Sequence, residues 1–208
     1  MSVTTIIKEL NSFQVDEIIE LTNDKNFVIF DMDGTILQSE GIHHIATNKL
    51  LSGIHFSEEE LYGLADIDLF KLASKYYEGD FESFVTQKNK MIIDSLDDQS
   101  INELMFSDYP KLFKSLKDNH KSLALVTASE HDVAHALLKH CNIHHFFDLI
   151  ITTKEVTLTK PNPEPYLLAL SKTERESSEA IIFEDSETGL QAALSSGIDT
   201  VKVTWYEN

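Results

Sequence analysis

The most informative stretch of the chain is Phe27-Val28-Ile29-Phe30-Asp31-Met32-Asp33-Gly34-Thr35. Its first four residues are apolar and carry no charge, which predicts a short strand buried on both faces. Two carboxylates and a hydroxyl follow at once. In an open α/β sheet, ligands bind outside the carboxyl ends of the strands. The stretch therefore predicts a central strand with a chemical site at its end.

Four further apolar runs predict the other strands of this sheet. They are residues 123–126, 149–151, 180–183 and 201–203. Helical patterns separate them, at residues 130–140, 163–171 and 189–196. This alternation of strand and helix predicts an α/β fold, with a Rossmann-like parallel core sheet of five strands.

The segment between the first two predicted strands is too long for one crossover helix. Residues 41–106 show helical spacing of apolar positions throughout. We therefore expect an inserted helical cap domain over 40–106, with a core formed by 1–39 and 107–208. Residues 1–25 also follow helical spacing, and we expect them to form a helical extension on the core.

Composition excludes several classes of protein. Among the 208 residues, 35 are acidic and 17 are basic, so the formal net charge is −18. This charge opposes binding to nucleic acid and to anionic membranes, and we expect neither as a partner. Arg175 is the only arginine. A bound phosphate would therefore be held by lysine, hydroxyls, backbone N–H groups or a metal rather than by an arginine clamp.

The rest of the composition is that of an intracellular globular protein. Cys141 is the only cysteine, which excludes an intramolecular disulfide, and we expect it to be buried. We find neither a signal-peptide pattern nor a run long enough to span a membrane, so we expect a cytoplasmic protein. It is expected to be a monomer or a weak homodimer. Trp205 and Tyr206 are expected to serve packing rather than recognition.

Further polar residues stand where the other predicted strands end. Thr127 and Ala128 follow the second strand, Lys160 follows the third, and Glu184 and Asp185 end the fourth. Clustered carboxylates repel one another unless they share a cation, and oxygen ligands select Mg²⁺. Mg²⁺ and a lysine together would offset the charge of a phosphoryl group. The strand ends therefore predict a site for phosphoryl chemistry.

These segments resemble, in order, the four motifs of the haloacid dehalogenase-like (HAD) hydrolase superfamily. The motif residues are 31–36, Thr127, Lys160-Pro161 and 184–186. The helical insert resembles the small cap of the subgroup that holds β-phosphoglucomutases and phosphoglycolate-type phosphatases. In that subgroup His43 would lie near the hinge into the cap, where it could act in function.

The resemblance implies catalytic roles for four residues. Asp31 would be the nucleophile, and Asp33 would act first as general acid and then as general base. Thr127 would bind the transferring phosphoryl group, while Lys160 would hold that group and Asp31 in place. Each role uses a residue type suited to it, because a carboxylate can form an aspartyl-phosphate and a second carboxyl can carry a proton.

The resemblance also implies the residues that bind the metal and the phosphate. The Mg²⁺ ligands would be Asp31, the backbone carbonyl of Asp33, Asp185 and Glu184. The phosphate would contact Gly34, Thr35, Thr127, Ala128 and Lys160.

The predicted function is a Mg²⁺-dependent phosphatase that hydrolyses a small phosphorylated metabolite through an aspartyl-phosphate. Dehalogenases lack an acid at the position of Asp33, so a phosphate ester is the expected substrate. The cap stretch 62–68 offers two acids and no base, which favours a phosphatase over a mutase that must grip a second phosphate. Two alternatives stay open: a phosphomutase of the β-phosphoglucomutase type, and a non-catalytic module that binds Mg²⁺ and a phosphorylated ligand.

Overall fold

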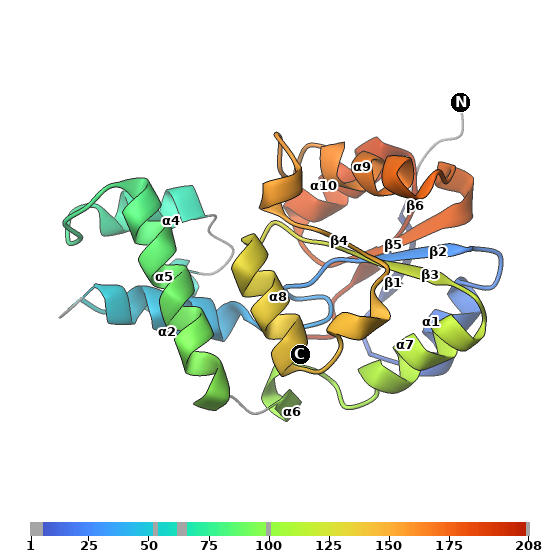
Figure 1. The fold of residues 1–208 in the computed structure, drawn as a ribbon, viewed down its shortest axis with the longest axis horizontal. Coiled ribbons are helices and arrows are strands. Elements are labelled where there is room, and N and C mark those ends of the chain that lie inside the picture. Colours follow the sequence, from blue (N-terminus) through green and yellow to red (C-terminus); the bar gives the residue numbers. More distant parts are fainter. Residues whose placement is uncertain (1–5, 52–53, 62–65, 99–100, 207–208) are drawn as a thin grey trace. The chain divides into compact units, whose positions relative to one another are not determined.

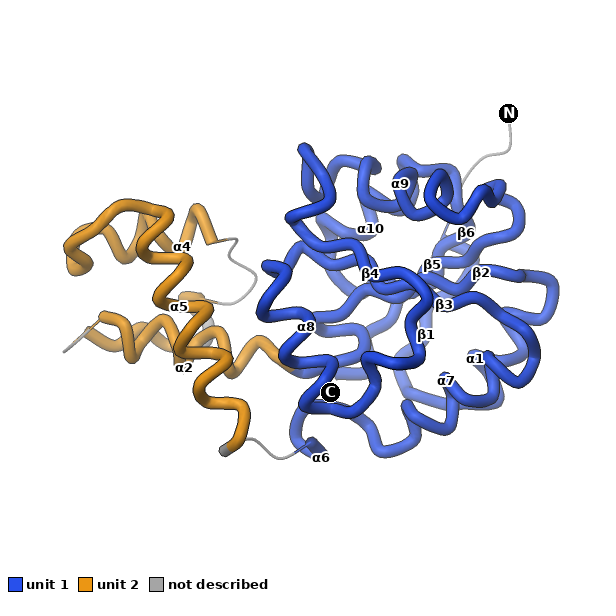
Figure 2. The backbone as a smooth tube through the Cα atoms, viewed as in Figure 1, with its two compact units in different colours: residues 1–38, 100–208 blue, residues 39–99 orange. Residues whose placement is uncertain are grey.

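The computed structural model describes residues 6–51, 54–61, 66–98 and 101–206. The chain folds into two compact units, which Figure 2 colours separately. Unit 1 comprises residues 1–38 and 100–208, and unit 2 comprises residues 39–99. The short helix α6 (Ile101–Leu104) belongs to unit 1 although it lies in the range predicted for the cap. The role of unit 2 as a cap domain stays a prediction.

Unit 1 is built on a parallel sheet with the strand order β1-β6-β5-β2-β3-β4 (Figure 1). The strands are β1 (Ile6–Leu10), β2 (Phe27–Phe30), β3 (Ser122–Val126), β4 (Leu149–Ile151), β5 (Ala180–Glu184) and β6 (Asp199–Val203). β2 lies in the middle, where Phe30 pairs with Leu125 of β3 and with Phe183 of β5. This register brings the carboxyl ends of three strands to one edge of the sheet.

The predicted Rossmann-like α/β fold is confirmed, but the sheet has six strands rather than five. The additional strand is β1, in the segment predicted to form a helical extension. Among residues 6–25, the described part of that segment, only α1 (Val15–Leu21) is an α-helix. β1 pairs in parallel with β6, with Leu10 opposite Val203. The β-branched Ile6 and Ile7 favour an extended chain, and β1 satisfies backbone groups that would otherwise be left open on the edge of β6.

Helices cover both faces of this sheet. α9 (Glu164–Thr173) and α10 (Glu187–Ser196) lie on one face, and α1 and α7 (Tyr109–Asp118) lie on the other (Figure 1). α8 (His131–His140) connects β3 to β4, and short 3-10 turns lie at His144–Phe146, Thr153–Glu155 and Ser177–Glu179.

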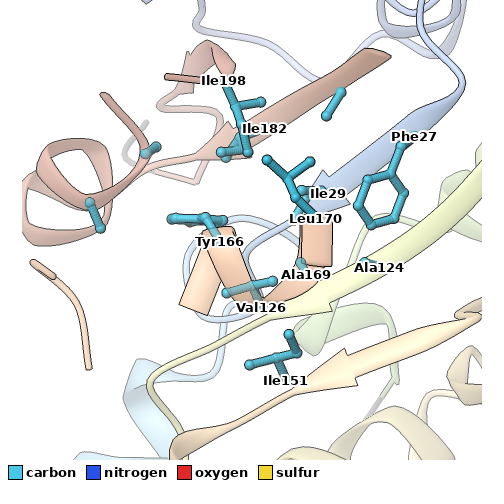
Figure 3. Close-up of a cluster of buried hydrophobic side chains, with 13 residues drawn as sticks. Phe27, Ile29, Ala124, Val126, Ile151, Tyr166, Ala169, Leu170, Ile182 and Ile198 are labelled. Atoms are coloured by element: carbon cyan, nitrogen blue, oxygen red, sulfur yellow. The ribbon is translucent and has the colours of Figure 1, made fainter. Parts of the chain in front are cut away.

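The side chains of each strand alternate between these two faces. On the α9 and α10 face, Ile29 and Ile182 pack in one buried cluster with Tyr166 of α9 and Ala192 of α10 (Figure 3). On the opposite face, the ring of Phe30 contacts that of Phe113 on α7, with centroids 5.5 Å apart. Burial on both faces explains why β2 carries no polar residue until its end.

Unit 2 is helical. Its helices are α2 (Glu40–Leu50), α3 (Glu58–Leu61), α4 (Asp66–Ala73), α5 (Phe81–Ser95) and the 3-10 turn Leu96–Asp98. Asp80 caps α5 by accepting a hydrogen bond from the Ser83 N–H at 2.8 Å. The buried core of the unit includes Leu61, Leu69 and Phe84. No helix among the described residues is both long and apolar enough to span a membrane.

Candidate active site

Asp31 begins the site at the carboxyl end of β2. Its backbone N–H donates to the carbonyl of Phe183 at 3.0 Å, so the β2–β5 hydrogen bonding continues one residue past the strand. The chain then turns at Gly34, whose φ is +83°. A Cβ at this position would lie 2.1 Å from Asp185 Oδ2. Both the backbone conformation and the available space therefore require glycine here.

Lys160 joins two of the acids. Its Nζ donates to Asp31 Oδ1 at 2.5 Å, to Glu184 Oε2 at 2.8 Å and to the carbonyl of Val126 at 2.9 Å. Burial alone would lower the pKa of Lys160, but the charges of Asp31 and Glu184 outweigh it and hold that pKa well above its usual value. Lys160 is therefore a permanent cation within the site.

Three carboxylates converge beside this lysine. Asp31, Glu184 and Asp185 each place an oxygen within 4.8 Å of the other two. Burial, followed by the charge of Glu184, raises the pKa of Asp31 well above its usual range, although Lys160 opposes this rise. The same two causes, in the same order, raise the pKa of Asp185 to about 7. One lysine does not balance three acids, and an all-oxygen donor set of this kind suits Mg²⁺.

Neighbouring side chains hold these acids in place. Thr35 Oγ1 donates to Asp185 Oδ1 at 2.7 Å. Tyr166 Oη donates to Glu184 Oε2 at 2.6 Å, and Ser186 Oγ donates to Glu184 Oε1 at 2.8 Å. Acid ligands fixed by such outer hydrogen bonds keep their orientation when a cation binds.

Tyr166 is a residue of the site that the sequence analysis missed. It lies on the first turn of α9, six positions after Lys160, and is fully buried. A tyrosine at a helix position that faces the sheet is normally part of the apolar core, and here the ring does pack there. Only the placement of its hydroxyl against Glu184 shows the second role.

Asp33 is directed to a different set of partners. Its Oδ2 accepts a hydrogen bond from Ser129 Oγ at 2.7 Å and from Thr127 Oγ1 at 3.2 Å. The structure thus groups the predicted acid–base residue with hydroxyls of the loop after β3. It groups the predicted nucleophile with Lys160 and the other acids.

The predicted phosphate contacts lie around these two groups. Gly34 forms the turn beside Asp185, and the hydroxyl of Thr35 is bonded to that acid. Ala128 is exposed in the loop after β3. Their roles in binding phosphate stay predictions.

Unit 2 contains a buried lysine that the sequence analysis also missed. Lys88 on α5 is 1% exposed. Its Nζ lies 2.5 Å from Asp66 Oδ1 and 3.5 Å from Nδ1 of His43. The spacing was informative, because Lys88 stands between the buried Phe84 and Ile92 at intervals of four residues on one helix. The base absent from the stretch 62–68, of which 62–65 lie outside the described residues, is present elsewhere in unit 2.

Comparison with known proteins places these motifs in a family. The family model described as haloacid dehalogenase-like hydrolase matches residues 28–203. The fructose-1-phosphate phosphatase YqaB of Escherichia coli (strain K12) is 28% identical over 187 residues, which cover 85% of this chain and 95% of that protein. A phosphorylated carbohydrates phosphatase of Thermotoga maritima is 25% identical over 186 residues, covering 84% and 82%.

A solved structure matches as well. The β-phosphoglucomutase of Clostridium difficile superposes with a TM-score of 0.73 at 26% identity, covering 88% of this chain and 86% of that one. The family match includes all four sequence motifs, and the resemblance seen in the sequence is confirmed. The chain belongs to the haloacid dehalogenase-like hydrolase family.

Proposed function

We propose that this protein is a Mg²⁺-dependent phosphatase that hydrolyses a small phosphorylated metabolite through an aspartyl-phosphate on Asp31. The observation that carries the proposal is the salt bridge of 2.5 Å between Asp31 and Lys160 at the carboxyl end of β2, with two further acids beside it. The relatives named as phosphatases of fructose-1-phosphate and of phosphorylated carbohydrates support this class of substrate.

The chain's own residues divide the reaction into two steps. Asp31 attacks phosphorus, the ester P–O bond breaks, and Asp33 gives its proton to the leaving oxygen. Water then attacks the aspartyl-phosphate, Asp33 takes a proton from that water, and the bond to Asp31 breaks to release phosphate. Ser129 and Thr127 hold the Asp33 carboxyl for this shuttle. Lys160 compensates the negative charge that gathers on the phosphoryl oxygens.

Asp31, Asp185, Glu184 and the backbone carbonyl of Asp33 would hold Mg²⁺. The ion would supply positive charge that keeps the carboxylates ionised and neutralises the phosphoryl group. The raised pKa values of Asp31 and Asp185 support this assignment, because buried acids that resist ionisation become stable anions beside a divalent cation.

A phosphomutase of the β-phosphoglucomutase type is the second candidate. The match to the β-phosphoglucomutase structure and the buried Lys88 favour it, since a mutase needs a cation for a second phosphate. Asp66 pairs with Lys88, however, and offsets its charge. The phosphatase therefore remains the better supported reading.

A phosphate-release screen over a panel of metabolite monophosphates, with and without Mg²⁺, tests the proposal. We expect release of inorganic phosphate that requires Mg²⁺ and that Asp31→Asn abolishes. Asp118→Asn, at an exposed ion pair with Lys114 on α7, is the matched control and should keep full activity. Isomerisation that needs a bisphosphate activator would identify the mutase. If no ester is turned over, the result would indicate a non-catalytic module that binds Mg²⁺ and a phosphorylated ligand.

The assignment to a cytoplasmic compartment and to a monomer or weak homodimer belongs to the same proposal. Both rest on the sequence alone.

A further inference from the structure

Three aromatic side chains donate hydrogen bonds to two consecutive carbonyls of the loop that follows the predicted nucleophile. Trp205 Nε1 donates to the carbonyl of Thr35 at 2.8 Å, and Tyr109 Oη donates to the same carbonyl. Tyr206 Oη donates to the carbonyl of Ile36 at 2.8 Å. The start of α7 and the C-terminal segment thus bind two successive peptide units of this loop.

Two phenylalanines support these donors. Phe13 lies with its ring centroid 4.3 Å from that of Tyr109 and 5.3 Å from that of Trp205. The ring of Phe106 stacks on Tyr206 at 4.7 Å and on Phe13 at 5.0 Å. We call these five residues the aromatic clamp. Phe13 comes from the connection between β1 and α1, so the N-terminal extension contributes to it.

The carbonyls of Thr35 and Ile36 are acceptors that water does not reach. Thr35 and Ile36 are fully buried, and a buried carbonyl without a donor is costly. The loop's own bonds run elsewhere: the N–H groups of Ile36 and Leu37 donate to Met32, and that of Gly34 donates to Leu37. The donors of the aromatic clamp, which lie outside the loop, therefore supply the hydrogen bonds that the carbonyls of Thr35 and Ile36 accept.

Thr35 also contacts the acid cluster. The hydroxyl of Thr35 donates to Asp185 Oδ1 at 2.7 Å, while its carbonyl is held by Tyr109 and Trp205. Asp31 stands four residues earlier in the same turn. A shift of the Thr35 peptide would move the hydroxyl away from Asp185 and change the path of the chain that carries Asp31.

We propose that Tyr109, Trp205 and Tyr206 are positioning residues for the candidate active site. They fix the carbonyls of Thr35 and Ile36, and through them the orientation of Asp185 and the turn after Asp31. The N-terminal extension stabilises them through Phe13. The consequence for catalysis rests on the proposed phosphatase function, whereas the consequences for loop order and metal binding do not.

The tyrosine donors keep their protons under all ordinary conditions. Burial raises the pKa of Tyr109 well above its usual value, and it also raises that of Tyr206. The clamp is accordingly a constant support and not a pH-sensitive one.

Two variants test the clamp with little loss of packing: Tyr109→Phe and Tyr206→Phe each remove one hydroxyl and keep the ring. We expect amide hydrogen exchange at Gly34 and Leu37 to accelerate by about tenfold, because loss of a donor to a buried carbonyl lowers the cost of opening the turn. Mg²⁺ affinity measured by calorimetry should fall by about threefold or more, because Asp185 loses its fixed orientation. With an active ester, kcat should fall while KM changes little.

The control is Leu138→Ala, a core variant on α8 that should lower the melting temperature without touching the clamp. If the tyrosine variants lower only the melting temperature, as the control does, and leave exchange at Gly34 and Leu37 and Mg²⁺ affinity unchanged, the clamp is structural and the proposal is wrong. If the screen finds no substrate, the phosphatase proposal fails alone, since exchange and Mg²⁺ binding still decide on the clamp. If the wild type binds no Mg²⁺, the exchange measurement decides by itself.

Discussion

Replacing Lys160 with methionine should destabilise unit 1, and it should do so more at high pH than at low pH. The lysine is 4% exposed at its side chain and lies within 2.8 Å of both Asp31 and Glu184. Methionine keeps most of the volume and removes the charge. Two buried carboxylates then face each other without a cation between them.

The expected size follows from the burial of the pair. Removing one partner of a buried ion pair costs about 3–5 kcal/mol, because the other charge stays in a poor solvent. For a chain of this length, that loss lowers the melting temperature by roughly 6–20 °C. Lys160 lowers the pKa of Asp31 in the native protein. Without Lys160 that pKa rises further, so the folded variant holds the Asp31 proton more firmly than the folded wild type does.

The sign of the pH dependence follows from this proton uptake. A folded state that binds more protons than the unfolded state gains stability as the pH falls. The loss of unfolding free energy caused by Lys160→Met should therefore be largest at about pH 8 and smaller at about pH 5. The double variant Lys160→Met/Glu184→Gln should recover part of the loss, because it removes one of the two charges.

The assay is urea unfolding without divalent cations, followed by the fluorescence of Trp205, which is the only tryptophan and lies in unit 1. The control is Lys114→Met, which breaks an exposed ion pair of 2.6 Å with Asp118 and should cost about 0.5 kcal/mol or less. If Lys160→Met unfolds at the same urea concentration as the wild type at about pH 8, Lys160 does not stabilise the buried charges of Asp31 and Glu184.

Three further results are expected. Gly189→Ala should lower the free energy of unfolding by about 1–3 kcal/mol and weaken Mg²⁺ binding, because its Cβ would lie 2.0 Å from Glu184 Cδ and force that acid to move. An unchanged Mg²⁺ affinity in calorimetry would contradict this prediction. Burial raises the pKa of Cys141 to about 11, so about one thiol in a thousand is ionised at about pH 8. Cys141 should therefore react with maleimide only after unfolding, and rapid labelling of the native protein would refute this prediction. Burial and Glu184 raise the pKa of Asp185 to about 7, so Mg²⁺ must displace its proton below that value; calorimetry should show affinity falling by up to about tenfold per pH unit on acidification, and a flat profile would refute the coupling.

Much of the candidate site could be predicted from the sequence because the relevant signals are local. A buried strand is a short uncharged run, and the polar residues of interest come directly after it, as Asp31 does after β2. Parallel strands place their carboxyl ends at one edge, so residues far apart in sequence could be expected to meet there. The contact of Lys160 with Asp31 and Glu184 in the structure agrees with that reasoning.

Other features depended on contacts that no local pattern encodes. The strand β1 forms because the edge of β6 is available to it. β6 lies almost two hundred residues later in the chain, and Leu10 of β1 pairs there with Val203. The burial of Lys88 required Asp66 to come within 2.5 Å from another helix. Helical spacing shows that a lysine stands on an apolar face, but it does not show which acid pairs with the lysine and stabilises its buried charge.

By itself, then, the sequence determined the fold class, five of the six strands, and the acids and lysine that meet at the sheet edge. These features follow from periodicity and from the position of polar residues after apolar runs. Only the tertiary structure decided what supports that site. The hydrogen bond from Tyr166 to Glu184, and those from Tyr109, Trp205 and Tyr206 to two consecutive carbonyls, form where the folded chain brings aromatic rings to buried acceptors. A buried polar atom must find a partner wherever the fold places one, and the fold, not the neighbouring sequence, sets which partner is in reach.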